Sequence, residues 1–409
     1  MAPEVRPGTP GSVRAVLASD DRILTTHAGS LPRPADLTAL LARLSRRQPV
    51  DSEALARLVG ESVTAVVARQ VEVGIDVGND GEQGRESFLT YVQHRMSGFG
   101  GAGEVARVWK DVADFPGFIE MRRAQRGGHE RVTLIRPPMA VGEVRYLDPA
   151  AIDAECDTLA AAAHAAATTA PGGAGLAEVF LTAPSPGIVA TAMANAHYPT
   201  MEDYVGAVAE ALGTEYRRIV ERGFVLQIDA PDLAMEHHGW FADRPLGEFL
   251  DFVDMVVAAM NRATDGLSAD RIRLHVCWGN YGGPHVHDVP LGDLLGHLYE
   301  ARVGGLLLSM ANPRHEHEHR ELARNPLPDA MVLAAGVIDT TTNYVEHPEV
   351  VAERLERVVT AVGDPHRVLA CTDCGFDTAA GFGEVAADIA WEKLRMLRAG
   401  ADLATARLL

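Results

Sequence analysis

Two side chains that can bind a metal lie two residues apart in the stretch RLHVCWGNY, residues 273–281. Successive side chains of a β-strand point to opposite faces, so His275 and Cys277 would share one face if this apolar stretch is a strand. An imidazole and a thiol on one face are two ligands of a metal site, or half of a cysteine–histidine nucleophile pair. The pair alone leaves a third interpretation open, which is two ordinary buried residues.

A second thiol, Cys374, follows another apolar run near the carboxyl end of the chain. Together with His275 and Cys277 it would supply one nitrogen and two sulfur ligands. Three protein ligands with one position left open are typical of catalytic zinc sites. Zinc binds a thiol as its thiolate and so provides a strong sulfur nucleophile at neutral pH. The set therefore favours zinc chemistry on a substrate thiol.

Cysteines and histidines elsewhere allow other interpretations. Cys371 and Cys374 form a CxxC pair of the kind that redox sites use, but on a strand their side chains would point apart, which weakens that interpretation. The loop residues 282–288 contain His285 and His287, which we interpret as part of a substrate loop or lid.

A third histidine group lies in PRHEHEHREL, residues 313–322. Its histidines alternate with glutamates, and this pattern is more typical of a solvated segment than of a metal site. His315 comes directly after a predicted strand, so it is the histidine expected to contact a substrate.

Eight short apolar runs of strand type must position these groups. They span residues 23–30, 73–80, 178–184, 224–231, 273–280, 304–313, 332–340 and 368–375. Most are separated by segments with apolar residues at helical spacing, at 52–74, 204–223, 246–264, 294–304 and 349–363. Eight strands alternating with helices predict an α/β fold of parallel units, and the number favours a closed (β/α)8 TIM-type barrel.

The remaining segments set the expected domain organisation. Residues 1–20 are rich in Pro, Gly and Ser and predict a flexible tail, and residues 21–409 predict a single catalytic barrel. The segment from about 90 to 176 breaks the alternation and predicts an inserted elaboration, with a hairpin over 131–147 and an Ala/Gly-rich helical part. No Gly-rich nucleotide motif follows a strand, which argues against a nicotinamide or ATP enzyme.

The carboxyl ends of the strands in such a barrel form one rim, and active sites lie there. Nearly every predicted strand ends in a polar group. These groups include His27, Ser30, Asp80, Glu82, Asp229, His275, Cys277, Ser309, Asn312, Asp339 and Cys374. Hydrogen bonds to loop backbones would account for some of them, but the convergence predicts an active site at the rim.

The composition restricts the class of protein. A net charge of −19, with no basic and aromatic cluster, argues against binding to nucleic acid. Four cysteines are too few and too widely spread for a disulfide framework in 409 residues. The chain has no apolar run of about 20 residues and no signal-peptide core, so we expect a cytoplasmic protein without a membrane partner.

Seven segments together resemble one enzyme family, the catalytic barrel of cobalamin-independent methionine synthase with its single-barrel relatives, including epoxyalkane:coenzyme M transferase. They are TTHAGSLPRP, DGEQGR, LQIDAP, HVCWGN, ANPRHEHE, GVIDTTT and TDCGFDT. The likeness extends from about Leu24 to the carboxyl end, and HxC with the later DCG cysteine is its most specific part. It implies a β/α barrel with a zinc cofactor, held by His275, Cys277 and Cys374, that alkylates a thiol.

The same resemblance implies a substrate site. Glu82 and Asp229 match carboxylates that hold the amino group of homocysteine, and the backbone from Ala28 to Ser30 matches the segment that binds its carboxylate. An amino-acid thiol needs a cation site, a carboxylate site and a sulfur site, and this rim would offer all three.

Two departures from the family pattern leave questions open. The family supplies a glutamate zinc ligand where this chain has Ser309 or Met310, so the fourth ligand is open. The long folate-binding amino-terminal half of the larger synthases is missing, so the donor is open among methyltetrahydrofolate, methylcobalamin and another electrophile.

The leading hypothesis is a zinc-dependent thiol alkyltransferase that transfers a methyl group to homocysteine or a related small thiol. A rim group such as Asp339 or His315 would supply the proton that the leaving group requires. The alternatives are addition of a thiol to an epoxide and a degenerate barrel that only binds a small ligand. Tetrapyrrole decarboxylation is the weakest, because fold alone does not imply function. A homodimer and a monomer both remain open.

Overall fold

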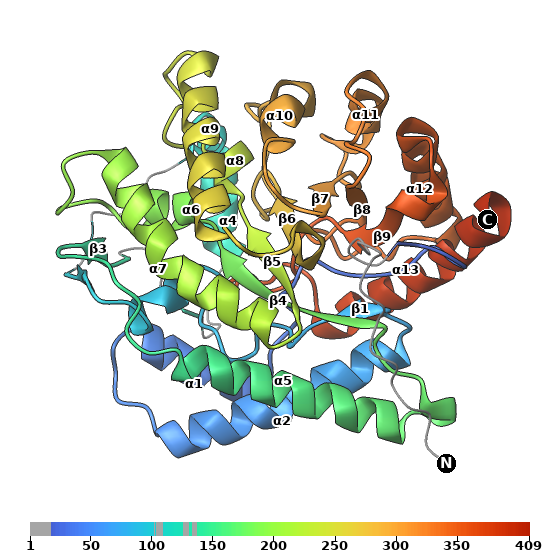
Figure 1. Cartoon of the computed structure of the whole chain (residues 1–409), viewed down its shortest axis with the longest axis horizontal. Helices are drawn as coiled ribbons and strands as arrows, with labels where there is room; N and C mark the ends of the chain where they lie inside the picture. The colour runs from blue at the N-terminus through green and yellow to red at the C-terminus, as the bar shows by residue number, and fades with distance from the viewer. Residues whose placement is uncertain (1–17, 102, 104–108, 126–130, 133–136) are drawn as a thin grey trace.

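A parallel β-sheet forms the centre of the protein. The computed structural model describes residues 18–101, 103, 109–125, 131–132 and 137–409. The sheet has the order β1-β4-β5-β6-β7-β8-β9, and helices surround it (Figure 1). Its strands are β1 (Val77–Gly78), β4 (Glu178–Pro184), β5 (Val225–Asp229), β6 (Ile272–Val276), β7 (Gly305–Ser309), β8 (Val332–Ile338) and β9 (Val368–Thr372). The predicted α/β fold with a parallel sheet is confirmed.

The strands from β5 to β9 are buried along their whole length. Helices cover one face of these strands, and other strands cover the opposite face. Both faces are therefore buried, and the sequences of these strands are mostly apolar. The inner face packs into a small core of Leu24, Ala28, Val77, Phe180, Val225, Leu307, Val332, Ala334, Leu369 and Cys371. The sheet therefore curls around its own side chains.

A short segment connects the two edges of the sheet. Thr26 forms a parallel bridge with Val77 of β1, and Thr25 forms one with Ala370 of β9. The segment was predicted as a full strand over residues 23–30, but the main sheet of the described chain has seven regular strands, and this segment joins it only through isolated bridges. The backbone leaves the strand conformation at Gly29, whose φ is 133° and where a Cβ would lie 2.7 Å from Glu82 Oε1.

The predicted helices all form, and most of their bounds differ by one to three residues. The helix expected at 294–304 is displaced and spans Leu291–Leu298. The helices are α1 (Ala35–Ser45), α2 (Ser52–Glu72), α3 (Lys110–Ala113), α4 (Pro116–Gln125), α5 (Ala150–Thr169), α6 (Pro186–Ala192), α7 (Met201–Glu221), α8 (Asp232–Met235), α9 (Leu246–Ala263), α10 (Leu291–Leu298), α11 (Glu321–Arg324), α12 (Pro348–Val362) and α13 (Ala387–Leu408). Local signals set several ends. The Asp51 side chain accepts hydrogen bonds from the first amides of α2, and α12 ends at Gly363 with a left-handed φ of 85°.

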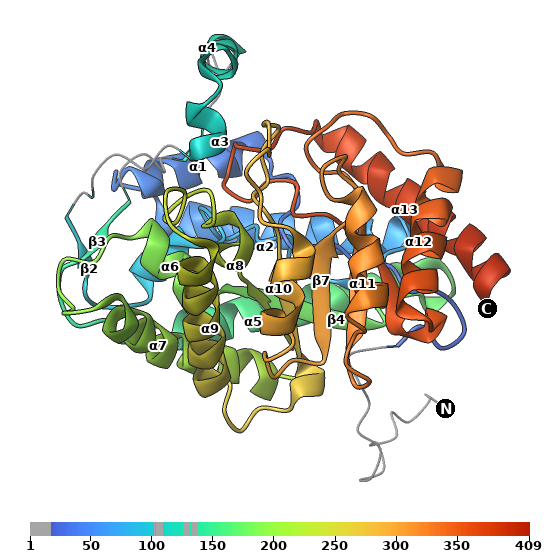
Figure 2. The same ribbon diagram turned by 90° about the horizontal axis from the view of Figure 1, so that it is seen from above.

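The segment from 90 to 176 differs from the expected hairpin. β3 (Met139–Ala140) pairs antiparallel with β2 (Phe99–Gly100), so its partner is an upstream segment, and residues 133–136 of the predicted hairpin lie outside the described residues. The Ala-rich part forms α5, which packs against α2 and α7. Helix α4 projects from the rest of the molecule, and α3 lies at its base (Figure 2).

The predicted amino-terminal tail lies outside the described residues except for 18–20. In the described part of the chain, every helix is too short or too polar to cross a membrane.

Candidate metal centre

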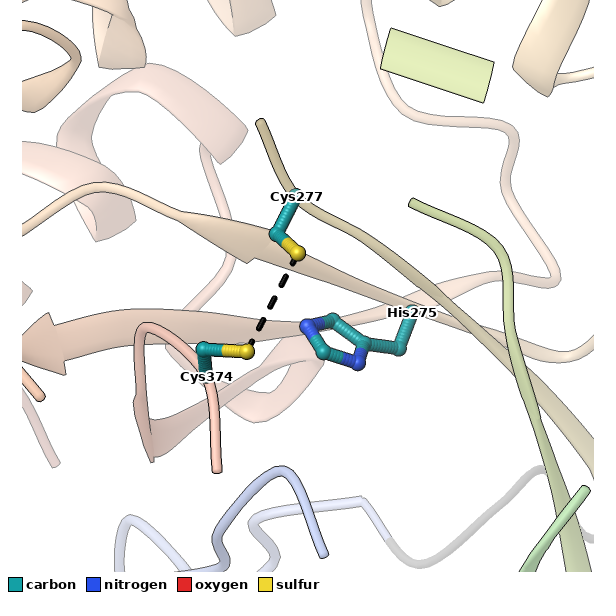
Figure 3. Close-up of side chains that lie close together, drawn as sticks. All are labelled: His275, Cys277 and Cys374. Carbon is teal, nitrogen blue, oxygen red and sulfur yellow. Dashed lines mark hydrogen bonds between the residues drawn. The ribbon is translucent and has the colours of Figure 1, made fainter. Parts of the chain in front are cut away.

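Three predicted ligands meet at the carboxyl ends of two strands. His275 lies on β6, Cys277 directly follows it, and Cys374 follows β9. Their side chains point toward one another (Figure 3), and one ligand atom from each lies within 4.8 Å of the others. Because β7 and β8 separate these strands in the sheet, the curl of the sheet is what brings the groups together.

The spacing of the two sulfur atoms fits a shared metal ion. The Sγ atoms of Cys277 and Cys374 are 3.9 Å apart. Zinc–sulfur bonds of about 2.3 Å place two thiolate sulfurs about 3.8 Å apart around a tetrahedral ion. A disulfide would require a bond of about 2.05 Å, and both cysteines are free.

A hydrogen bond with Asp229 orients the imidazole of His275. Its Nδ1 lies 2.9 Å from Oδ1 of Asp229, and because a carboxylate only accepts, Nδ1 donates. Nε2 is buried and has no hydrogen-bond partner among the described residues. Gln227 Nε2 donates to the same Asp229 oxygen at 2.7 Å. A carboxylate that fixes the tautomer and direction of a histidine is the usual support of a metal ligand.

The electrostatic environment favours a thiolate. The contact with the Cys374 thiol, followed by the nearby His275 imidazole, holds the pKa of Cys277 well below its ordinary value although burial opposes this. The same contact raises the pKa of the Cys374 thiol. Burial is the largest single effect and acts to lower the pKa of His275, but the contacts with Asp229 and Cys277 together outweigh burial and raise the pKa to about 10. The cluster thus holds the anionic sulfur that a metal ligand or a nucleophile needs.

Strand β7 supplies no carboxylate to this cluster. It ends at Ser309, whose hydroxyl donates to the backbone carbonyl of Asp373 at 2.7 Å. Among the described residues, one imidazole and two thiols have ligand atoms within 4.8 Å of one another, and no fourth ligand joins this group. The described cluster therefore offers one nitrogen and two sulfur ligand atoms.

A pocket with a volume of about 310 Å³ adjoins the cluster, and His275, Cys277 and Cys374 line it. The predicted substrate-binding residues line the same pocket, namely Ala28, Ser30, Glu82 and Asp229. Much of the remaining wall is apolar or aromatic, with Phe88, Leu89, Trp109, Ile188, Met235, Tyr281, Ala379 and Phe382. No lysine or arginine occurs among the described residues that line it.

One carboxyl oxygen of Glu82 has no hydrogen-bond partner among the described residues. Its Oε1 accepts a hydrogen bond from Thr182 at 3.0 Å, whereas Oε2 is buried without a partner among the described residues. Burial, followed by the nearby charge of Asp229, raises the pKa of Glu82 to about 8. The backbone at Glu82 has a φ of 55°, which is uncommon for a residue with a side chain. A cationic group in the pocket would satisfy this carboxyl.

His315 and Asp339, the two residues expected to transfer protons, do not line the pocket. His315 stacks on Trp278, and its ring nitrogens lie 2.7 Å from Glu318 and 2.8 Å from Asp288. The side chain of Asp339 accepts from the amide and hydroxyl of Thr341. Asp339 directly follows β8, as expected, whereas His315 lies six residues beyond the end of β7. Both side chains are engaged in loop contacts, so the geometry gives no support to a role in proton transfer.

Several important residues escaped the sequence analysis. Asp373 accepts hydrogen bonds from the amides of Met310, Ala311 and Asn312 at 2.8, 2.8 and 2.9 Å, and so fixes the turn that carries Cys374. Its position beside the DCG cysteine was a usable signal. Trp109 lies in the elaboration, where no pattern pointed to the pocket.

Several known proteins are similar to this chain in sequence or in structure. No protein-family model matches the chain. Methionine synthase of Sulfolobus acidocaldarius is 25% identical over 352 residues, covering 86% of this chain and 85% of that relative. 2-Hydroxypropyl-CoM lyase of Xanthobacter autotrophicus is 25% identical over 425 residues, covering 96% and 98%.

The structure is similar to that of a B12-independent methionine synthase from Shewanella sp. W3-18-1 in complex with selenomethionine. The TM-score is 0.69 with 19% sequence identity, and the match covers 94% of this chain and 98% of that chain. The resemblance inferred from the sequence is confirmed: the chain is a homologue of enzymes named methionine synthase and 2-hydroxypropyl-CoM lyase, with the fold of a B12-independent methionine synthase.

Proposed function

We propose that this protein is a zinc-dependent thiol alkyltransferase that transfers a methyl group to homocysteine or a related small thiol. The observation that carries the proposal is the shared pocket, in which a nitrogen and two sulfurs converge beside the buried carboxyl of Glu82. The homologues named methionine synthase support the same class of reaction. We also infer that the segment at Thr25 and Thr26 completes an eight-stranded barrel formed by residues 21–409.

His275, Cys277 and Cys374 would hold the zinc ion. Zinc would act as a Lewis acid that keeps the acceptor sulfur in its thiolate form at neutral pH. Asp229 orients the imidazole of His275 and leaves Nε2 free for coordination. The apolar and aromatic wall offers few hydrogen-bonding groups to water near the sulfur, and this would keep the nucleophile weakly solvated.

The acceptor would be held by its amino-acid end. Glu82 offers Oε2 to an ammonium group. The amide of Ala28 donates to Thr372 Oγ1, and the amide of Gly29 donates to His27 Nδ1. Neither amide is therefore available to the carboxylate of the acceptor. Ser30 Oγ accepts from the amide of Asp377, which leaves its hydroxyl proton for the carboxylate of the acceptor. We therefore assign carboxylate binding to the Ser30 hydroxyl rather than to the whole backbone segment.

A second candidate is the addition of a thiol to an epoxide. The 2-hydroxypropyl-CoM lyase, which matches nearly the full length of this chain, favours it. A sulfonate-bearing thiol would need a cationic partner, and the described lining residues include carboxylates but no lysine or arginine. The pocket is therefore better suited to a thiol that carries an ammonium group.

The proposal is tested by incubating the zinc-loaded protein with homocysteine and, in turn, methyltetrahydrofolate, methylcobalamin and a simple epoxide, and by measuring each product by mass spectrometry. Methionine formation is the expected result with one methyl donor. Cys374→Ala should abolish it. Cys371→Ala is the matched control, since Cys371 belongs to the inner core and does not line the pocket. Full activity of Cys374→Ala without bound metal would overturn the proposal.

A further inference from the structure

A second cluster of metal-binding side chains lies outside the site described above. We propose that Asp111, His238, His285 and Asp288 form a second binding site, for a divalent transition-metal ion such as zinc. Ligand atoms of Asp111, His285 and Asp288 all lie within 4.8 Å of one another. His238 Nδ1 lies 3.1 Å from Asp288 Oδ1 and 3.7 Å from Asp111 Oδ2.

Three separate segments bring these residues together. Asp111 lies on α3, His238 follows α8, and His285 and Asp288 lie in the loop between β6 and α10. The side chains of Asp111, His238 and Asp288 are almost completely buried, with exposures of 0%, 0% and 1%. His285 is 15% exposed at its side chain, which provides a route for an ion.

The strongest observation is a set of buried polar atoms without hydrogen bonds. Both ring nitrogens of His238 and Oδ1 of Asp288 have no hydrogen-bond partner among the described residues. His238 Nδ1 and Asp288 Oδ1 are close, yet they lack hydrogen-bond geometry. Leaving such groups unpaired costs about 1–3 kcal/mol each. An ion between them would satisfy a nitrogen and an oxygen at once.

The spacing and type of the atoms identify the class of ion. Ligands about 2.0–2.2 Å from zinc lie about 3.3–3.5 Å apart in a tetrahedral site. The distances of 3.1 and 3.7 Å around His238 Nδ1 lie on either side of that value. Two imidazoles and two carboxylates balance the charge of a divalent ion, and this ligand set suits a first-row transition metal.

A bound proton is the competing explanation, since His285 and His315 both approach Asp288 Oδ2, at 2.9 and 2.8 Å. Those contacts use Oδ2 and leave Oδ1 unpaired. Protonation of His285 and His315 would therefore provide hydrogen bonds to Oδ2 of Asp288 only. The ion would bind Asp288 Oδ1 together with His238. His285 Nδ1 would bind the ion in place of its contact with Asp288 Oδ2, while His285 Nε2 keeps its contact with the Tyr281 carbonyl oxygen at 3.0 Å.

Such an ion would stabilise the wall that Trp109 and Tyr281 form in the pocket beside the first metal centre. Trp109 directly precedes α3, and its ring lies 6.1 Å from that of His238 and 4.9 Å from that of Tyr281. Trp109 and Tyr281 both line the pocket, and the Tyr281 hydroxyl lies 3.4 Å from Asp111 Oδ2. Binding of the ion would therefore fix the position of both aromatic rings.

The test uses a variant in which the first site cannot bind. Cobalt(II) is added to the full-length Cys277→Ser/Cys374→Ser protein, and binding is followed by equilibrium dialysis and by visible absorption. We expect one cobalt ion per chain, with weak d–d bands and no thiolate-to-cobalt band, because all ligands are nitrogen and oxygen. The result is independent of the proposed function, which requires the cysteines.

Two further variants on this background complete the test. Asp288→Asn removes the central ligand, and His285→Gln is a milder change at the more exposed ligand. Each should lower cobalt affinity at least tenfold, whereas His197→Gln, at a histidine outside both clusters, should leave it unchanged. If Asp288→Asn does not fold, the cobalt affinity of His285→Gln decides whether the second site exists. Absence of cobalt binding by the cysteine-free protein, or unchanged affinity in His285→Gln, overturns the second site.

Discussion

Glu82 is the residue whose surroundings say most about the acceptor. Its carboxyl is buried in the pocket with one oxygen unpaired. A hydrogen bond to a charged group, here the ammonium of the acceptor, contributes about 1.5–3 kcal/mol, which corresponds to a change in binding of about 10- to 100-fold. We expect Glu82→Gln to raise the KM for homocysteine by about that factor.

The control for this prediction is an acceptor without the amino group. The KM for 4-mercaptobutyrate should be almost the same in the wild-type protein and in Glu82→Gln. Steady-state kinetics with both thiols measures the difference. An equal rise in KM for both would mean that Glu82 shapes the pocket but does not bind an ammonium group.

The raised pKa of Glu82 predicts a dependence of stability on pH. Burial, followed by the charge of Asp229, raises the pKa from 4.5 to about 8. The folded protein therefore keeps a proton that the unfolded chain releases between these values. Stability from this group is complete below pH 4.5 and is lost as the pH rises through about 8.

Urea unfolding of the chelator-treated protein between pH 5 and pH 8 measures this effect. The free energy of unfolding of the wild type should fall with rising pH relative to that of Glu82→Gln. Parallel curves for the two proteins would contradict the assignment of a raised pKa.

The candidate ligands could be predicted at the level of residues because strand alternation places His275 and Cys277 on one face. The proton-transfer residues could not be predicted in the same way. Asp339 directly follows β8 and His315 lies in the loop after β7, but their contacts with Thr341, Glu318 and Asp288 depend on loop conformation. A strand end places a residue on the rim, but not its side chain in the pocket.

The junction of β8 and β9 determines where Cys374 lies. A Cβ at Gly336 would approach Asp373 Oδ1 to 2.4 Å and the Leu308 carbonyl oxygen to 2.8 Å. Gly336→Ala should therefore displace Asp373 from its hydrogen bonds to the β7 loop and move Cys374. We expect a loss of about 1–3 kcal/mol of stability and weaker zinc binding, measured by urea unfolding and chelator competition.

Gly206 on α7 is the matched control. A Cβ there would meet nothing within 4 Å, so Gly206→Ala should stabilise the helix by about 0.5–1 kcal/mol and leave zinc affinity unchanged. If both variants bind zinc like the wild type, the position of Cys374 does not depend on the packing of Gly336 against Asp373.

At the scale of elements, the strands and long helices could be predicted because their apolar periodicity follows directly from burial. The segment 23–30 was predicted as a regular strand, but it leaves that conformation at Gly29, where the crowding by Glu82 is a tertiary effect. The antiparallel partner of β3 is β2, which precedes it by about forty residues, and a local hairpin pattern carries no information about such distant pairing.

The whole molecule is acidic, and so is the described charged lining of the pocket. With a net charge of −19 and no lysine or arginine among those lining residues, a polyanionic donor is repelled on approach. Raising the ionic strength from about 0.01 to 0.15 M shortens the screening length from about 30 to 8 Å. The KM for a folate donor should therefore fall with added salt, whereas that for an uncharged donor should stay constant.

Kinetics at several concentrations of potassium chloride, with both donors, provide the measurement. A KM for the folate donor that rises with salt would point to a cationic binding region beyond the described lining residues.

The central claim is that His275, Cys277 and Cys374 hold one metal ion with a position open for substrate sulfur. Visible and near-ultraviolet absorption of the cobalt(II)-loaded protein tests it most directly, since thiolate-to-cobalt bands report sulfur ligands. The account predicts such bands in the wild type, an increase on addition of homocysteine, and their loss in Cys277→Ser/Cys374→Ser. A wild-type spectrum without thiolate bands, or one that homocysteine leaves unchanged, would contradict it.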